Sequence, residues 1–254
     1  MADDQENVKS ALALPPTSAA AGGTSPDAYA QWRATTLGAV TEALEQLCVL
    51  ELVGPVNGKH VLDLGAGDGL LTHTLATQGA LAVGIDIDRS MLLAATSRAE
   101  RGQGPPARFV MGRLEQLPFR NASFDVVVAV TVLCLVPDQT VAVREAARVL
   151  RPGGRIVIGD LGRWNAWTVR RRIKGWFGSR LWRSARFTSA ADLTRLLERA
   201  GLTVETVRGS VYYPPLGLLA KPLARLDRWI GSATTVGAAF IAVAATKGDV
   251  PGQR

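Results

Sequence analysis

Short apolar runs alternate with helical patterns through the middle of the chain. Five of these runs have the length and the β-branched content of buried strands, at residues 61–64, 81–85, 107–111, 124–130 and 155–160. Helical patterns lie between them, one beginning at Leu70, one covering 90–100 with Ser90 as its expected cap, and one covering 140–150. Strands and helices that alternate in this way predict a parallel sheet with right-handed crossovers.

The two ends of the chain follow other patterns. Residues 1–27 are rich in Ala, Pro, Ser, Thr and Gly without periodicity, so we expect a disordered tail there and one domain over 28–254. An amphipathic helix is predicted at 41–52, inside an N-terminal helical part at 28–53. After the fifth strand and a long insert, the pattern predicts a helix at 192–200 and strands at 202–213 and 238–246.

The first predicted strand runs directly into a glycine-rich turn, V-L-D-L-G-A-G-D-G at residues 61–69. Glycines at alternate positions let backbone pass where a Cβ would collide, so a flat ligand can lie against the turn. The dinucleotide fingerprint needs its third glycine three positions after the second, and Leu70 occupies that position. Asp63 and Asp68 flank the turn; they would repel a pyrophosphate, whereas they would attract an ammonium and a sulfonium.

A third carboxylate follows the second predicted strand. Asp86 stands seventeen residues after Gly69, where a doubly wound fold has a carboxylate that accepts hydrogen bonds from ribose hydroxyls. Asp63, the alternate glycines and Asp86 therefore fit an adenosine ligand that carries no phosphate. S-adenosylmethionine is the ligand that we expect.

These segments resemble a known family. V-L-D-L-G-A-G-D-G and the later V-G-I-D-I-D are similar to the first two motifs of the class I S-adenosylmethionine-dependent methyltransferases. L-P-F at 117–119, S-F-D at 123–125 and E-A-A-R-V-L-R-P-G-G at 145–154 resemble its small-molecule branch, methyltransferase type 11, which includes quinone-biosynthesis enzymes. The resemblance covers residues 29–162 well. It implies a doubly wound α/β fold with a mostly parallel, seven-stranded sheet whose last two strands form an antiparallel pair at the edge.

The resemblance also implies which residues bind the cofactor. Asp63 and the glycine turn would hold the methionine portion, and Asp86 the ribose. Residues 112–114 would border the adenine, and Thr131 would lie beneath the sulfonium. The implied set is Asp63, Gly65, Ala66, Gly67, Asp86, Ile87, Arg113, Leu114 and Thr131, with Tyr29 and Trp32 from a lid segment.

Two positions depart from the family pattern. Relatives usually have Asp where Arg113 stands, and arginine cannot accept a hydrogen bond from the adenine amino group. The adenine is then read by the backbone at Leu114, by Glu115, or by Arg113 stacking on the ring. Relatives often have His where Cys134 stands, and we expect Cys134 to be a structural thiol rather than a reactive one. No catalytic residue is assigned, and the candidate proton acceptors are Tyr212, Tyr213 and Asp160.

The lid segment reads Y-A-Q-W-R-A-T-T-L-G at residues 29–38. It is similar to an N-terminal segment that folds over the cofactor in one methyltransferase subgroup. Tyr29, Trp32 and Arg33 could form a wall beside the sulfonium, which cation–π attraction favours. A helix that packs its aromatic side chains on the sheet explains the same residues equally well, so both interpretations stay open.

Composition narrows the class of protein. The chain has 254 residues, 47% of them hydrophobic, which suits one α/β domain with a full core. The two cysteines, Cys48 and Cys134, are too few for a disulfide framework and predict a reducing compartment. Their spacing with the two histidines does not fit a set of metal ligands, so we expect no metal site. The acidic N-terminus does not read as a signal peptide and the apolar runs are too short to span a bilayer, so a soluble, cytoplasmic protein is expected.

One insert makes the protein basic. The net charge is +7, and residues 163–186 hold eight basic residues and no acidic one. On a helical wheel Ala166, Val169, Ile173, Trp176 and Phe177 share one face, with Arg170, Arg171, Arg172 and Lys174 off it. Such a helix suits an acceptor-site lid, with or without peripheral contact to an anionic membrane. A lid packed on the domain with solvated arginines is the plain alternative, and nucleic acid is the least favoured partner.

A second apolar and basic insert precedes the last strand, so cap segments are expected at 162–187 and 214–236. Two such inserts favour transfer of a methyl group from S-adenosylmethionine to a hydrophobic small molecule, such as a quinone precursor, a phenol or a lipid-like metabolite. Methylation of RNA or protein through the basic insert is one alternative. A regulator that binds S-adenosylmethionine without catalysis is the other, and the altered positions 113 and 134 are consistent with it.

Overall fold

A computed structural model of the chain describes residues 25–102 and 106–248. The strands are β1 (His60–Leu64), β2 (Leu81–Asp86), β3 (Arg108–Met111), β4 (Phe124–Val130), β5 (Leu150–Leu161), β6 (Leu202–Ser210) and β7 (Phe240–Lys247). The helices are α2 (Pro26–Ala34), α3 (Thr36–Val53), α4 (Leu70–Thr77), α5 (Arg89–Arg101), η2 (Leu133–Leu135), α6 (Gln139–Val149), α7 (Ala166–Trp176), α8 (Arg180–Ser184), α9 (Ala190–Arg199) and α10 (Gly217–Ala233).

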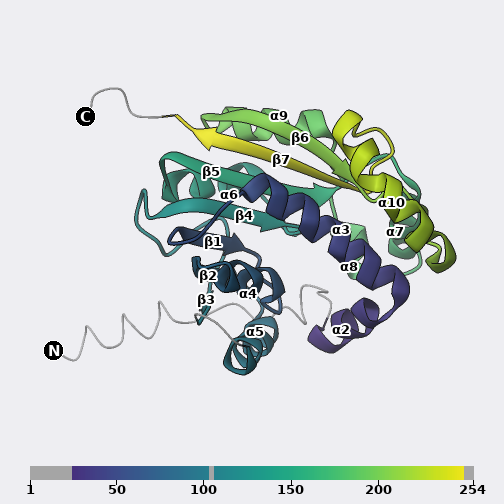
Figure 1. Cartoon of the computed structure of the whole chain (residues 1–254), viewed down its shortest axis with the longest axis horizontal. Helices are drawn as coiled ribbons and strands as arrows, with labels where there is room; N and C mark the ends of the chain where they lie inside the picture. The colour runs from purple at the N-terminus through teal and green to yellow at the C-terminus, as the bar shows by residue number, and fades with distance from the viewer. Residues whose placement is uncertain (1–24, 103–105, 249–254) are drawn as a thin grey trace.

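The seven strands form one sheet in the order β3-β2-β1-β4-β5-β7-β6 (Figure 1). The pairs from β3 to β5 are parallel, whereas β7 is antiparallel to both β5 and β6. The chain order reverses between β1 and β4, which is the point where open α/β sheets bind ligands. The predicted doubly wound, mostly parallel sheet with an antiparallel edge pair is therefore confirmed.

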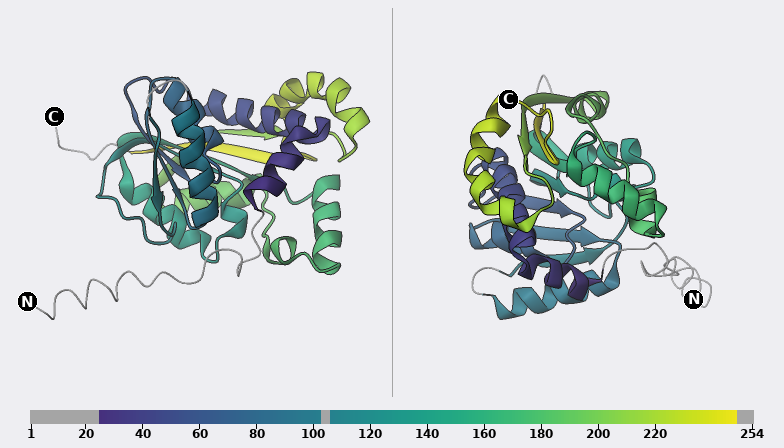
Figure 2. Two further views of the ribbon diagram at one scale, coloured as in Figure 1. Left: turned by 90° about the horizontal axis from the view of Figure 1, so that it is seen from below. Right: turned by 90° about the vertical axis from the view of Figure 1, so that its right-hand side faces the viewer.

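Two cores lie on the two faces of this sheet. Helices α3, α4 and α10 contribute to one, and α6 and α9 to the other. The central strands β1 and β4 are buried on both faces because they carry continuous apolar runs. Helices α2, α7 and α8 gather with one end of α10 beyond the end of the sheet to which β4 and β5 point (Figures 1 and 2).

Several element boundaries differ from the sequence-based expectation. Helix α2 begins at Pro26, within the expected tail 1–27, while residues 1–24 lie outside the described part of the chain. Helix α3 begins at Thr36 rather than 41, because Thr35 caps it by accepting a hydrogen bond from the Gly38 N–H. Asp88, not Ser90, caps α5. Strand β5 begins at Leu150 rather than 155, with an irregularity in its pairing with β4 near this beginning.

Strand β6 ends at Ser210 instead of 213 because a buried carboxylate from α10 takes over its backbone donors. Asp227 accepts hydrogen bonds from the Ser210 hydroxyl at 2.7 Å, the Val211 N–H at 3.0 Å and the Tyr212 N–H at 2.9 Å. Val211 has a positive φ of 63°, so the chain turns sharply there. Asp227 thus fastens the second cap segment to the sheet.

Replacing Asp227 by Ala should therefore destabilise the fold. Three buried donors would lose their acceptor, and we expect the free energy of unfolding to fall by about 2–4 kcal/mol. Chemical denaturation followed by circular dichroism measures this loss. Asp27→Ala, at an exposed position in the first turn of α2, is the control and should cost less than about 1 kcal/mol. Equal stability of the Asp227 variant and the control would contradict the anchoring role.

Candidate functional site

The glycine turn joins β1 to α4 at the carboxyl end of the sheet. Gly65, Gly67 and Gly69 all have positive φ, at 71°, 54° and 77°. A Cβ on Gly65 would lie 2.3 Å from a methyl carbon of Val132, whereas a Cβ on Gly67 would meet no atom within 4 Å. A side chain at Gly65 would therefore collide with Val132, whereas the backbone at Gly67 faces open space.

Two carboxylates from neighbouring strands meet at this turn. Asp63, at the end of β1, is 2% exposed and accepts a hydrogen bond from the Thr72 hydroxyl at 2.6 Å. Asp86, at the end of β2, accepts from the Gly67 N–H and from the Asp88 N–H, both at 2.8 Å. Burial raises the pKa of Asp63 to about 7 and also raises the pKa of Asp86. Asp63, Gly65, Ala66, Gly67 and Asp86 are thus brought together as predicted from the sequence.

Asp68 has a different role from the one that we expected. It was predicted to attract a cationic ligand together with Asp63, but two arginines already neutralise it. Arg33 of α2 pairs with its carboxylate, and Arg98 of α5 pairs with it at 2.6 Å. Since a carboxylate between two guanidinium groups has little charge left for a ligand, Asp68 instead fastens both helices to the glycine turn.

Helix α2 carries the lid aromatics. Tyr29 and Trp32 stack with ring centres 5.7 Å apart, and the Arg33 guanidinium lies 4.4 Å from the Tyr29 ring centre. Arg33 also reaches Glu42 of α3 at 3.5 Å, so the lid is tied both to the turn and to α3. This geometry brings Tyr29 and Trp32 near the turn, and it is compatible with both of the interpretations given for them above.

The segment after β3 lies next to Asp86. The Gly112 N–H donates to the Asp86 carbonyl at 3.0 Å, and Leu114 is buried. Arg113 is exposed and pairs with Glu115 at 3.6 Å. Because these two side chains pair with each other, the backbone at Leu114 is the simplest of the three groups that we considered for hydrogen bonding or stacking with the adenine. Ile87 follows Asp86 with an exposed side chain.

The other wall of the site is formed by the ends of β4 and β5. The Thr131 N–H donates to the Gly159 carbonyl at 2.8 Å, and the Cys134 thiol donates to the Thr131 carbonyl at 3.4 Å. Burial raises the pKa of Cys134 well above its usual range, as expected for a structural thiol. Burial also raises the pKa of Asp160 to about 7, and its Oδ2 has no hydrogen-bond partner among the described residues.

The hydroxyls of the other two candidate proton acceptors form hydrogen bonds within the protein. The Tyr213 hydroxyl shares a hydrogen bond with the Thr41 hydroxyl at 2.9 Å, and the Tyr212 hydroxyl donates to the Thr234 carbonyl. Burial raises the pKa of both phenols to about 12. Of the three candidates, Asp160 alone, near the carboxyl end of β5, has a carboxylate oxygen that accepts no hydrogen bond from any described residue.

The helical wheel did not indicate which positions of α7 turn inward, and the structure leaves the apolar face that it grouped exposed. The inward positions are Trp167, Thr168, Arg171 and Gly175, whereas Trp176 and Phe177 are 80% and 87% exposed. Arg171 was therefore missed as an interior residue. The i, i+4, i+8 spacing of Trp167, Arg171 and Gly175 was the signal that could have revealed it.

Glu45 of α3 was missed as well. Burial raises its pKa to about 7, and the positive charge of Arg171 partly offsets this rise. Within the described part of the chain, no three His, Cys, Asp or Glu side chains are arranged to hold a metal ion. None of the described helices has the length and apolar content needed to cross a bilayer.

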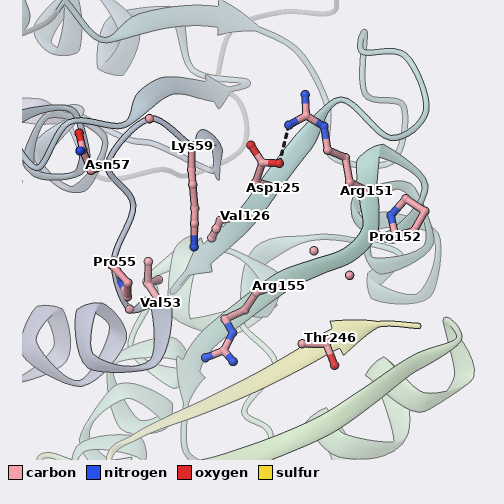
Figure 3. Close-up of a pocket in the computed structure, with 14 residues that line it drawn as sticks. Val53, Pro55, Asn57, Lys59, Asp125, Val126, Arg151, Pro152, Arg155 and Thr246 are labelled. Atoms are coloured by element: carbon pink, nitrogen blue, oxygen red, sulfur yellow. Dashed lines mark hydrogen bonds and ion pairs between the residues drawn. The ribbon is translucent and has the colours of Figure 1, made fainter. Parts of the chain in front are cut away.

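Two hollows lie outside the glycine turn. One, of about 710 Å³, is at the opposite end of the sheet, where Arg151 pairs with Asp125 and Lys59 and Arg155 line the wall (Figure 3). Its position at the amino ends of the strands makes it a poor ligand site for this fold. The other, of about 1030 Å³, lies beside α7 and α8 and is lined by Arg163, Arg172, Arg183, Arg186, Trp176 and Trp182 among others.

Comparison with known proteins agrees with this geometry. Residues 62–158 match a family model described as a methyltransferase domain. A demethylmenaquinone methyltransferase of Tropheryma whipplei is 42% identical over 108 residues, which are 42% of this chain and 44% of that protein. The match thus spans less than half of that relative's length. A ubiquinone biosynthesis O-methyltransferase of Idiomarina loihiensis is 31% identical over 64% of this chain and 69% of its own.

Solved structures share the fold. A methyltransferase from Thermotoga maritima, described as S-adenosylmethionine-dependent and as a possible histamine N-methyltransferase, superposes with a TM-score of 0.63. The alignment covers 87% of this chain and 95% of that one at 22% sequence identity. At this identity the likeness extends to the arrangement of the sheet and its helices, and not to the acceptor.

Proposed function

Because the chain belongs to the S-adenosylmethionine-dependent methyltransferases, we propose that it transfers a methyl group to an apolar small molecule. A quinone precursor, a phenol or a lipid-like metabolite are the acceptor classes. Family membership implies S-adenosylmethionine as the cofactor. The observation that carries the proposal is the meeting of Asp63 and Asp86 at the glycine turn. Helices α2, α7 and α8 lie beyond the same end of the sheet (Figure 2).

The residues at the turn fit this cofactor. Gly67 has open space on the side of its missing Cβ, and the buried carboxylate of Asp63 provides a counter-charge for an ammonium. Asp86 would accept from the ribose hydroxyls beside Ile87, and the backbone at Leu114 would read the adenine next to Arg113. Gly65 and Ala66 would line the methionine portion, Thr131 would lie beneath the sulfonium, and Tyr29 and Trp32 would close the site.

S-adenosylmethionine, when bound, supplies an electrophilic methyl group on a sulfonium. The chain's own contribution is alignment and the exclusion of water, since an in-line displacement needs both partners at a fixed separation and angle. The lid α2, fastened by Arg33 to Asp68, and the cap helices α7 and α8 provide the exclusion. Asp160 is the best-placed of the three candidates to take a proton from an acceptor hydroxyl, because its Oδ2 accepts no hydrogen bond within residues 25–102 and 106–248.

Cofactor binding should depend on pH through Asp63. The raised pKa of about 7 means that this carboxyl is largely protonated at pH 6 without cofactor. An ammonium favours the ionised form, so binding should release a proton below pH 7. The affinity should rise up to about tenfold per pH unit between pH 5 and 7 and level off above. Calorimetric titration in two buffers of different ionisation enthalpy measures the released proton.

Glu45 and Asp160 titrate in the same range, because burial raises the pKa of each to about 7 as well. Asp63→Asn separates their contribution from that of Asp63. The variant should bind S-adenosylhomocysteine more weakly and without the proton release. Undiminished proton release in Asp63→Asn would assign the effect to one of the other two carboxyls.

We further propose that the cap contacts an anionic membrane. We define the cap surface as the exposed apolar side chains on and beside α7 and α10, namely Trp164, Val169, Ile173, Trp176, Phe177, Leu216, Leu218, Leu219, Leu223, Leu226 and Trp229. Leu218 is 95% exposed and Trp229 is 74% exposed, which is unusual for side chains of this size. Exposed arginines and lysines, among them Arg170, Arg172, Lys174, Lys221 and Arg225, surround these side chains.

Helix α7 is joined by hydrogen bonds to the segment that leads into α10. The Trp167 indole N–H donates to the Tyr213 carbonyl at 2.8 Å, and Arg170 donates to the Pro215 carbonyl at 3.4 Å. An apolar surface ringed by cations suits the interface of a membrane with anionic lipids. A protein at that interface would have direct access to a lipid-like acceptor.

A transfer assay tests the main proposal. The protein would be incubated with S-adenosylmethionine that carries a radiolabelled methyl group and with a panel of catechols, hydroquinones and prenylated phenols. We expect label to enter at least one apolar acceptor. Label that enters only RNA or protein would support the basic-insert alternative, and cofactor binding without transfer to any acceptor would support a regulator.

A further inference from the structure

The guanidinium of Arg171 is held between two indole rings on the inner side of α7. Its central carbon lies 5.4 Å from the ring centre of Trp167 and 5.1 Å from that of Trp182. Trp167 is buried and is fixed by its hydrogen bond to the Tyr213 carbonyl. Because aromatic faces attract a cation, the two rings fix the guanidinium in one position. Its neighbours Arg170 and Arg172 are exposed instead.

This guanidinium has no protein partner for one of its nitrogens. The Arg171 Nη1 atom is buried and makes no hydrogen bond to any described residue, and Arg171 takes part in no ion pair within the described ranges. Glu45, Asp160 and Cys134 influence it only at longer range. A buried charged donor without an acceptor is costly, so such a group calls for an explanation in terms of a ligand, an ion or water.

Arg171 lies near the place where the methyl acceptor is expected to bind. Asp160 stands at the carboxyl end of β5, fully buried, and it interacts electrostatically with Arg171. The adjacent Gly159 carbonyl accepts from the Thr131 N–H, and Thr131 lies where the sulfonium is expected. Arg171 is therefore near the end of the sheet from which a methyl group would be transferred, with the tryptophan rings as apolar walls beside it.

We infer that Arg171 is a specificity-determining residue of the acceptor site, and that it selects acceptors with an anionic oxygen on an aromatic or apolar body. The inference rests on the proposed methyltransferase function and names the polar feature of its substrate. A guanidinium offers two parallel donors to a carboxylate or an ionised ring hydroxyl. The rings of Trp167 and Trp182 would contact the body of the same molecule.

The neighbouring acidic groups do not cancel this preference. Burial raises the pKa of Glu45 and of Asp160 to about 7, so both carboxyls are partly protonated near neutral pH. Burial likewise favours the neutral Cys134 thiol. Arg171 remains charged, although burial lowers its pKa from the usual value for arginine. Below about pH 7, where both carboxyls are mostly protonated, an acceptor anion would therefore meet a net positive site.

Binding of matched probes tests the inference. The protein would first be saturated with S-adenosylhomocysteine and then titrated with two pairs, 2-naphthoate against 2-naphthamide at pH 6, where Glu45 and Asp160 are mostly protonated, and ionised 4-nitrocatechol against neutral catechol at pH 8. The first pair tests a carboxylate and the second an ionised hydroxyl. We expect the wild-type protein to prefer the anion of at least one pair by about tenfold.

Variants assign the preference to this residue. In Arg171→Met the preference should fall below about threefold, whereas Arg172→Met, which removes the same charge one position away, should retain it. Arg171→Lys should retain only part of the preference for the anion, because an ammonium lacks the two parallel donors of a guanidinium. If Arg171→Met does not fold, the inference is tested by whether Arg171→Lys shows a weaker preference for the anion than the wild-type protein. A wild-type protein that prefers neither anion, or a preference that survives substitution of Arg171, would overturn the inference.

Affinity for S-adenosylhomocysteine separates this outcome from failure of the proposed function. It should be unchanged in all three variants, since Arg171 lies on the acceptor side of the site. Wild-type protein that does not bind S-adenosylhomocysteine would refute the methyltransferase proposal itself. Normal cofactor binding together with indifference to the anionic probes would refute the role of Arg171 alone.

Discussion

Replacing Asp86 by Ala is expected to reduce the affinity for S-adenosylmethionine at least a hundredfold. The carboxylate would accept hydrogen bonds from both ribose hydroxyls, and bonds to a charged acceptor contribute about 1.5–3 kcal/mol each. It also accepts from the Gly67 N–H at 2.8 Å and so holds the glycine turn against β2. Calorimetric titration with S-adenosylhomocysteine measures the loss.

Asp125→Ala is the matched control. This carboxylate pairs with Arg151 at the opposite end of the sheet, beside the hollow in Figure 3, so its loss should leave cofactor affinity within about twofold. Thermal unfolding of both variants would show whether either has lost its fold. A folded Asp86→Ala protein with wild-type affinity would remove Asp86 from the site.

The second large effect is expected at the cap surface. Changing Trp176 and Phe177 together to Ser should weaken binding to vesicles that contain about 30% phosphatidylglycerol by on the order of a hundredfold. Each of these side chains is at least 80% exposed and would bury most of its area in the lipid interface. Co-sedimentation with vesicles at increasing salt measures both the apolar and the electrostatic contribution.

Leu81→Ser with Leu93→Ser is the control for general loss of exposed apolar area. These side chains are 53% and 57% exposed, but β2 and α5 lie away from the cap. The control should keep wild-type vesicle binding, and neutral vesicles should bind all variants weakly. Equal vesicle binding by the cap variant and the control would exclude the cap surface as the membrane contact.

The parts that were predicted well are those where burial dictates the residue type. The central strands β1 and β4 are buried on both faces, so their sequences are continuous apolar runs whose type and order are easy to read. The glycine turn was equally clear, because positive φ at three alternate positions leaves few residues other than glycine. Asp63 followed from its place near the end of β1, and Asp86 from its place at the end of β2.

The parts that were missed depend on contacts between distant segments. Nothing near Asp68 in the sequence shows that Arg33 and Arg98 neutralise it, from 35 and 30 residues away. Asp227 reads as one polar residue in an amphipathic helix, yet it accepts three hydrogen bonds from the end of β6. The helical wheel of α7 grouped its apolar side chains, but it did not show that the guanidinium of Arg171, off that face, lies between two tryptophan rings.

The acceptor side of the site follows from the same long-range contacts. Arg171 comes from an insert, Asp160 from the end of β5 and Glu45 from α3, and only the folded chain brings their charges within range of each other. Sequence motifs recover the cofactor half of such a site because they form one continuous turn. The substrate half has no continuous motif, and its chemistry becomes visible in buried atoms that lack partners.

The most direct test of the central claim is a calorimetric titration of the purified protein with two ligands. The turn after β1, with Asp63 and Asp86 beside it, should bind S-adenosylmethionine or S-adenosylhomocysteine in a one-to-one complex and should show no heat of binding with NAD. Saturable binding of NAD together with indifference to both adenosyl sulfur compounds would contradict it.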